Sequence, residues 1–160
     1  MADQLQNLND NLKIQARIYA ELNELARQKQ QALTSNNLHN LEAVTVQEEQ
    51  LLLEAARLEK ERLMWAEQIG LELGKASEDL TLTELAEHYP ELREVQIELD
   101  NVIMQLRQAH EINTQLLQQA LKVVDFTVGL MTQEQATTYN HPGRKEINTA
   151  SRAHLLDRSV

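Results

Sequence analysis

Hydrophobic residues recur at alternating spacings of three and four residues along most of the chain, which is the repeat of an amphipathic helix. The first such segment runs from about residue 3 to residue 33, and its stripe comprises Leu5, Leu8, Leu12, Tyr19, Leu22, Ala26 and Leu33. Four polar residues, Thr34 to Asn37, then interrupt the pattern and favour a tight turn with an N-cap. Because the connection is so short, the next helix is predicted to run back antiparallel.

The second segment runs from about residue 38 to residue 73. Its stripe comprises Leu41, Val44, Leu51, Ala55, Leu58, Trp65 and Ile69. Oppositely charged residues spaced three or four apart, such as Arg57 and Glu61, indicate that another face of this helix is in water. Gly74 is typical of a helix end.

A connector with one short helix is predicted between Ser77 and Tyr89. Thr81 and Glu84 have the spacing of a capping box, in which each side chain bonds to backbone at the start of a helix. Pro90 then disfavours helix at the preceding residue and suits the first turn of the next helix.

The third long segment, from about Glu91 to Met131, holds the heptad spacing for twelve successive positions: Leu92, Val95, Leu99, Val102, Leu106, Ala109, Asn113, Leu116, Ala120, Val123, Thr127 and Leu130. Its second half has additional apolar residues, namely Ile112, Leu117, Val124, Phe126 and Val128. The pattern ends near Gln133. We therefore expect a helical domain over residues 1–132 and a flexible C-terminal tail over 133–160, with room there for a short amphipathic helix.

Composition agrees with an all-α protein. The chain has only four Gly and two Pro in 160 residues, and aromatic residues make up 3%, which disfavours a β-sandwich. The predicted fold is an elongated antiparallel helical bundle or coiled coil of three long helices, with a short connector helix and a flexible tail.

The charge pattern excludes several partners. There are 25 acidic and 15 basic residues, and no basic cluster that would neutralise phosphates, so nucleic-acid binding is not expected. An acidic surface also repels anionic membranes. The chain has no cysteine and no signal-peptide pattern at its start, so we expect a cytoplasmic protein.

Candidate catalytic or metal-binding residues are few. None of the five histidines follows a glutamate by three residues, the spacing of di-iron bundles, so no metal or cofactor is expected. Glu48 occupies a core-spaced position, where a desolvated acid catalyst is one interpretation and a groove-edge residue or ion pair is the favoured one. Trp65 is interpreted as a core residue. The sequence does not predict an enzyme.

Asn113 interrupts the apolar stripe of the third helix. One interpretation is structural, because a single Asn in a heptad core fixes the register of helices at a cost in stability. The other is that another molecule contacts the helix at this point.

Several short motifs resemble those of the FlgN family of flagellar export chaperones. They are Glu-Glu-x-Leu at 48–51, Leu-Glu-x-Glu-Arg at 58–62, Asn-x-x-Leu-Leu at 113–117 and Thr-Tyr-x-x-x-Gly at 138–143. The resemblance covers most of residues 1–145 and rests on the order and spacing of these motifs. It implies a chaperone that binds the C-terminal helical segment of the hook–filament junction proteins FlgK and FlgL. It also implies docking at the export gate component FlhA through Tyr139, with Gly143 in the same motif.

The surplus of apolar residues on the third helix supplies a physical basis for partner binding. An exposed apolar face of this size needs a cover, and an amphipathic helix of the cargo fits such a face. The expected partner-binding residues are Asn113, Leu116, Leu117, Ala120, Val123, Val124 and Leu130. In the absence of cargo, the cover is expected to be the tail or a second copy of the chain.

Two alternatives remain open. The first is a structural coiled-coil or adaptor protein, or a related FliT-like or FliJ-like flagellar component, in which the surplus apolar face is a homodimer interface. The second is a helical-bundle enzyme or metal protein, which stoichiometric iron or zinc in the purified protein would reveal.

Overall fold

The computed structural model describes residues 2–138 of the chain. This part is built from four α-helices and two short 3-10 helices, and it contains no strand. Contacts within the chain divide it into two units, Met1–Ala120 and Leu121–Val160, which are described separately. The predicted all-α fold is confirmed.

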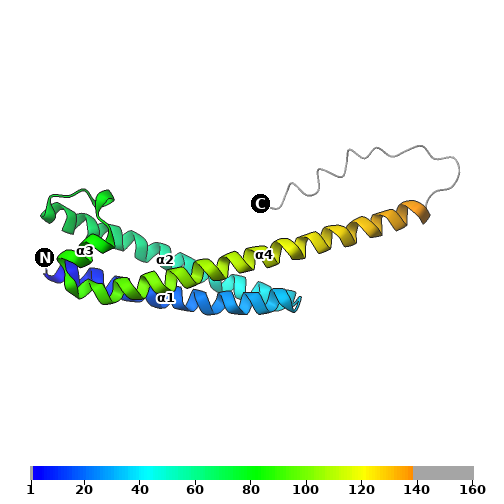
Figure 1. Ribbon diagram of the computed structural model, residues 1–160, viewed down its shortest axis with the longest axis horizontal. Helices are drawn as coiled ribbons and strands as arrows, with labels where there is room; N and C mark the ends of the chain where they lie inside the picture. Colours follow the sequence, from blue (N-terminus) through cyan, green and yellow to red (C-terminus); the bar gives the residue numbers. More distant parts are fainter. Residues whose placement is uncertain (1, 139–160) are drawn as a thin grey trace. The chain divides into compact units, whose positions relative to one another are not determined.

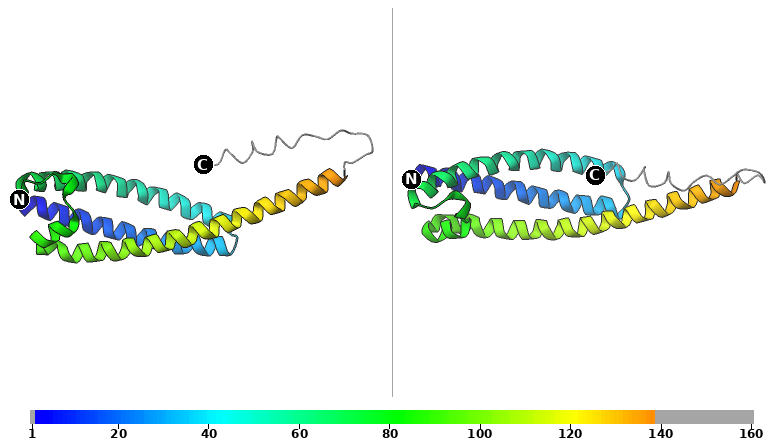
Figure 2. Two further views of the ribbon diagram at one scale, coloured as in Figure 1. Left: turned by 45° about the horizontal axis from the view of Figure 1, so that its top comes forward. Right: turned by 90° about the horizontal axis from the view of Figure 1, so that it is seen from above.

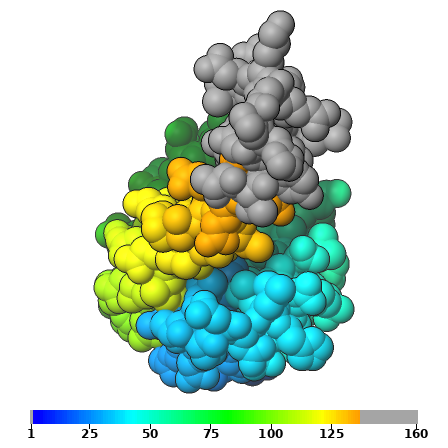
Figure 3. All heavy atoms as spheres, turned by 90° about the vertical axis from the view of Figure 1, so that its right-hand side faces the viewer, coloured from blue at the N-terminus to red at the C-terminus, as the bar shows by residue number. Residues whose placement is uncertain are grey.

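Helices α1 (Ala2–Thr34) and α2 (Leu38–Leu73) form an antiparallel hairpin, as the short polar connection predicts (Figure 1). Asn36 adopts a left-handed backbone conformation with φ of 52°, which asparagine tolerates better than most residues. The side chain of Asn37 then caps α2 by accepting a hydrogen bond from the Asn40 backbone N–H over 3.1 Å. The end of the hairpin, where α1 passes into α2, lies in the blue and cyan surface of Figure 3.

The connector after α2 also agrees with the prediction. Gly74 ends α2 in the left-handed conformation, and the Lys75 N–H donates to the Gly70 carbonyl over 2.9 Å. A 3-10 turn, η1 (Ser77–Asp79), leads to the short helix α3 (Leu82–His88). The Thr81 side chain caps α3 by accepting from the Glu84 N–H over 3.2 Å.

Helix α4 (Arg93–Thr138) follows a second 3-10 turn, η2 (Pro90–Leu92). It therefore begins two residues after the expected Glu91 and ends seven residues after the expected Met131. Residues 132–138 contain no Gly or Pro, and Gln, Glu and Ala favour helix even where no apolar face is buried. The boundary expected between residues 132 and 133 falls inside this helix and stays a prediction, and residues 139–160 lie outside the described part.

The main hydrophobic core of residues 2–120 lies where α3 and η2 fold against α1, α2 and the first turns of α4 (Figure 2). Its largest fully buried side chains are Leu8, Leu12, Ile69, Leu92 and Val95. Trp65 is partly buried and packs against this cluster, so its interpretation as a core residue is confirmed. A second cluster further along the hairpin comprises Ile18, Leu22, Ala55 and Leu58.

Amide side chains on α1 make hydrogen bonds to the neighbouring helices. Asn11 Nδ2 donates to the Leu58 carbonyl of α2 over 3.1 Å, and Asn23 Nδ2 donates to Gln105 Oε1 of α4 over 3.0 Å. Asn11 and Asn23 are 5% and 8% exposed. A hydrophobic stripe alone tolerates sliding by a turn, whereas these bonds are satisfied in one register only, so they fix the alignment of the helices.

Candidate partner-binding surfaces

The α4 segment Leu121–Met131 carries a dense set of exposed apolar side chains. All residues from 121 to 136 are exposed. The large apolar ones are Leu121, Val123, Val124, Phe126, Val128, Leu130 and Met131, and their exposed fractions range from 47% to 68%. The only charged residues within the segment are Lys122 and Asp125. Seven large apolar side chains within eleven residues form a surface of the kind that marks a binding site.

The residues predicted to bind a partner are distributed between the two units. Val123, Val124 and Leu130 belong to the exposed segment just described. In residues 2–120, Leu117 is 43% exposed, and Leu116 and Ala120 are half-buried. Asn113 differs from all of these, because it is 5% exposed and belongs to the interior of the bundle.

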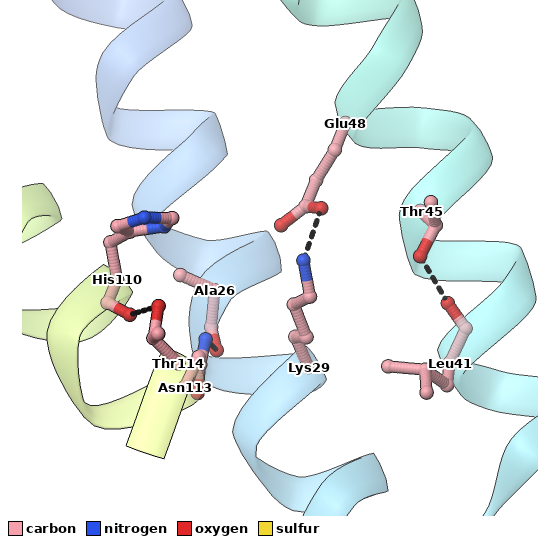
Figure 4. A network of polar contacts seen from close by, with 8 residues as sticks. All are labelled: Ala26, Lys29, Leu41, Thr45, Glu48, His110, Asn113 and Thr114. Atoms are coloured by element: carbon pink, nitrogen blue, oxygen red, sulfur yellow. Dashed lines mark hydrogen bonds and ion pairs between the residues drawn. The ribbon is translucent and has the colours of Figure 1, made fainter. Parts of the chain in front are cut away.

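The surroundings of Asn113 support its structural interpretation. Its Nδ2 atom donates to the backbone carbonyl of Ala26 on α1 over 2.8 Å (Figure 4). Its Oδ1 atom is buried and accepts no hydrogen bond from the part of the chain that the structure describes. Asn113 thus joins α4 to α1 while leaving one acceptor unsatisfied.

A groove of about 570 Å³ lies beside Asn113, between α1, α2 and α4. Apolar and polar side chains from all three helices line it: Tyr19, Leu22, Ala26, Lys29, Glu48, Leu52, Ile103, Leu106, Arg107, His110 and Asn113. The sequence pattern did not predict this groove, because Leu52 and Arg107 lie off the apolar stripes. Two of its residues, Glu48 and Asn113, stood out in the sequence because each is polar at a core-spaced position.

Glu48 forms an ion pair with Lys29 of α1, with Nζ and Oε2 3.0 Å apart (Figure 4). The two side chains are 17% and 27% exposed, so the pair is sheltered at the groove edge. The expectation that Glu48 meets a cation from another helix is confirmed.

A second polar cluster comprises Tyr19, Glu59 and Arg62. Arg62 donates to both carboxylate oxygens of Glu59, over 2.8 and 2.5 Å, and these hydrogen bonds lower the pKa of Glu59. The same hydrogen bonds raise the pKa of Arg62. Burial, followed by the nearby Glu59 charge, raises the pKa of Tyr19. The Arg62 side chain is 27% exposed, and its guanidinium turns toward Glu59.

Residues 2–138 hold no group of three or more His, Cys, Asp or Glu side chains placed to bind a metal ion. None of the helices in this range has a stretch long and apolar enough to cross a membrane. Tyr139 and Gly143, the residues predicted to dock at the export gate, lie outside the described residues.

Comparisons with known proteins identify one family. No curated protein and no solved structure matches the chain. A family model described as FlgN protein matches residues 1–147, which is most of the 160-residue chain and includes α1, α2, α3 and α4. The chain therefore belongs to the FlgN family, whose members are chaperones of flagellar export.

Proposed function

We propose that this chaperone binds the C-terminal helical segment of the hook–filament junction proteins FlgK and FlgL through the α4 segment Leu121–Met131. The observation that carries the proposal is the exposure of seven large apolar side chains within eleven residues. An amphipathic helix of the cargo buries such a face in the helix-in-groove mode of recognition. Leu116, Leu117 and Ala120 precede the segment on the same helix and belong to the proposed contact.

Bound cargo is kept soluble and unassembled, because its own apolar helix face is covered by the chaperone. We further propose that the chaperone acts in the cytoplasm and delivers its cargo to the export gate by docking at FlhA through Tyr139 and Gly143. The support for this step is the Thr-Tyr-x-x-x-Gly motif at 138–143, which resembles the family motif.

The test is binding of purified C-terminal fragments of FlgK and FlgL from the same genome to the full-length chain, measured by calorimetry. Val124→Glu is expected to weaken binding by about tenfold or more, because it places a charge in a desolvated apolar contact. Gln118→Glu is the matched control, since Gln118 is exposed and lies with Lys122 and Asp125 on the polar side of α4. Unchanged binding by Val124→Glu, with helicity retained by circular dichroism, would contradict the proposal.

Self-association is a second candidate function, because the same exposed face would bury equally well against a second copy. Sedimentation at two protein concentrations distinguishes the two. A concentration-dependent dimer that binds neither fragment would favour a structural coiled-coil or adaptor role. Binding of the filament-cap protein in place of FlgK and FlgL would favour a FliT-like chaperone.

A further inference from the structure

The groove between α1, α2 and α4 has the dimensions of a binding site. Its volume of about 570 Å³ falls within the usual range for ligand pockets, roughly 300–1,000 Å³. Leu22 and Ala26 of α1 line it, together with Leu52 of α2 and Ile103 of α4. Leu52 is 54% exposed, although it lies beside other apolar side chains of the groove. Leu22 and Ala26 are each 5% exposed, so the uncovered apolar surface belongs to Leu52 and the half-buried Ile103.

The unsatisfied atom of Asn113 adds a polar requirement to the groove. Asn113 is 5% exposed, its Nδ2 atom is already bonded to Ala26, and its buried Oδ1 atom lacks a donor among residues 2–138. A buried acceptor without a partner costs about 1–3 kcal/mol. Because the atom is closed off from solvent, a ligand N–H or O–H group reaches it only by displacing the groove side chains around it, and the new hydrogen bond then recovers that cost.

Charge at the groove edge adds a second requirement. Glu48 is already paired with Lys29, whereas Arg107 on the α4 side is exposed and makes no ion pair with any described residue. His110, one turn further along α4, also lines the groove (Figure 4). Residues 1–120 hold 21 acidic and 10 basic residues, yet the charge left unpaired at this edge is positive. A carboxylate on the ligand complements it.

We propose that this groove binds one amphipathic helix of the export substrate, which packs apolar side chains on Leu52 and Ile103. The substrate helix also places a carboxylate at Arg107 and a side-chain N–H or O–H group at Asn113 Oδ1. The inference rests on the proposed function, since the occupant is the substrate itself. It adds a second contact in residues 2–120 that does not involve the segment Leu121–Met131.

The experiment measures binding of the same FlgK and FlgL fragments to the full-length chain with groove variants. Leu52→Gln is paired with Leu53→Gln, because Leu53 is the adjacent residue, is 73% exposed and does not line the groove. Arg107→Glu is paired with Arg93→Glu, which makes the same charge change on the same helix outside the groove. Both groove variants are expected to weaken binding by about fivefold or more, and both controls by less than about twofold.

Asn113→Leu distinguishes a loss of binding from a loss of folding, because its stability and its affinity for the fragments are expected to change in opposite directions. The substitution removes the acceptor and fills the buried site with an apolar side chain, so the protein is expected to be at least as stable while it binds the fragments more weakly. Equal or tighter binding by Asn113→Leu would overturn the role assigned to Oδ1. The apolar and charged contacts are tested separately, by Leu52→Gln and Arg107→Glu with their controls.

The outcomes separate this inference from the proposed function. If the groove variants bind like wild type while Val124→Glu loses binding, the groove is not a substrate site. The proposal that the segment Leu121–Met131 binds the substrate is then supported. If the groove variants lose binding while Val124→Glu does not, the proposal that the segment Leu121–Met131 binds the substrate is contradicted, and the proposal for the groove is supported. If the groove variants change only the sedimentation of the free chain, the occupant is a second copy and the inference fails.

Discussion

The side-chain amide of Asn113 on α4 donates a hydrogen bond to the backbone carbonyl of Ala26 on α1 over 2.8 Å (Figure 4). The two residues are 87 positions apart in the sequence. Within a helix, a carbonyl such as that of Ala26 already accepts the N–H of the residue four positions later, so the bond from Asn113 is additional. The hydrogen bond from Asn113 therefore favours one alignment of α4 against α1. In this alignment the buried Oδ1 atom of Asn113 has no hydrogen-bond donor among the described residues, which is unfavourable.

Replacing Asn113 with an apolar residue should not lower the stability of the protein. Asn113→Leu removes a buried acceptor without a partner, while the Ala26 carbonyl keeps its helical bond. We expect the free energy of unfolding to be unchanged or higher by about 1 kcal/mol, measured by urea denaturation with the fluorescence of Trp65 as the probe. A loss of more than about 2 kcal/mol would show that the hydrogen bond outweighs the unsatisfied atom.

Asn113→Asp is the opposite test at the same position. It buries a carboxylate against the carbonyl oxygen of Ala26 and removes the amide donor, so we expect a loss of about 2 kcal/mol or more at pH 7. Lowering the pH to 4 should recover part of this loss, because protonation removes the buried charge and restores a donor. A variant equally stable at both pH values would mean that water reaches this site.

The ion pair between Lys29 and Glu48 should couple α1 to α2. Its atoms are 3.0 Å apart and both side chains are mostly buried, so solvent screens the pair less than a surface pair. In a double-mutant cycle of Lys29→Met and Glu48→Gln, we expect a coupling free energy of roughly 1 kcal/mol that shrinks little in 1 M salt. The exposed pair Arg57 and Glu61 is the comparison, and its coupling should be smaller and salt-sensitive. If the two ion pairs had equal coupling free energies, Lys29 and Glu48 would not be less screened by solvent than Arg57 and Glu61.

Stability should fall in mild acid through Glu59. The hydrogen bonds from Arg62 lower the pKa of Glu59 in the folded state. The stabilisation is therefore complete above the unfolded-state pKa, near the usual 4.5, and is lost as the pH falls through the lower folded-state pKa. Arg62→Gln should flatten this part of the stability profile, whereas Lys60→Gln, a charge loss at an exposed neighbour, should not.

The size of this effect is limited by solvent, because the Glu59 side chain is 44% exposed. We expect a difference below about 1 kcal/mol between the profiles of wild type and Arg62→Gln. Denaturation in urea at half-unit pH intervals would measure it. A profile for Arg62→Gln that is steeper than wild type would mean that the sign of the Glu59 shift is wrong.

Three glycines should respond differently to substitution by alanine. A Cβ atom at Gly70 would lie 2.8 Å from the Lys75 backbone oxygen, so we expect Gly70→Ala to lower the free energy of unfolding by about 2 kcal/mol. Gly74 has open space but a φ of 68°, so Gly74→Ala should cost about 1 kcal/mol from backbone strain alone. Gly129 has neither constraint, and Gly129→Ala should stabilise α4 locally by about 0.5–1 kcal/mol.

Hydrogen exchange is the measurement that separates the local effect at Gly129 from the global effects at Gly70 and Gly74. Amides around residue 129 should exchange more slowly in Gly129→Ala, while urea denaturation should change only for the other two variants. If Gly70→Ala proved harmless, the close approach of the Lys75 carbonyl to α2 would be wrong.

Some helix ends were easier to predict than others, because some depend on local caps and glycine and others on helix propensity along an exposed segment. Gly74 and the Thr81 cap act through local backbone geometry, and α2 and α3 end and begin where these residues predict. The end of α4 was placed too early at Met131, because that estimate relied on an apolar stripe. An exposed helix needs only residues that favour helix, and residues 132–136 supply Gln, Glu and Ala without any buried face.

The partner surfaces were predictable only where they depend on one helix. The excess of apolar residues after Leu116 is visible in the sequence, because a helix face follows from spacing alone. The groove beside Asn113 was not visible, since Leu22, Leu52 and Ile103 come from three helices and each looks ordinary on its own. Nor did the buried amides Asn11 and Asn23 stand out, because burial depends on neighbours that spacing does not identify.

The sequence by itself determined the all-α class, the antiparallel α1–α2 hairpin, the short connector helix and the apolar surplus on α4. Those features depend on interactions within a few residues, namely helical periodicity, caps, turns and the placement of glycine and proline. Only the tertiary structure decided which polar groups are buried, which charges are paired and where a groove remains. These properties depend on how helices far apart in the chain are aligned, and Asn113 meets Ala26 in only one such alignment.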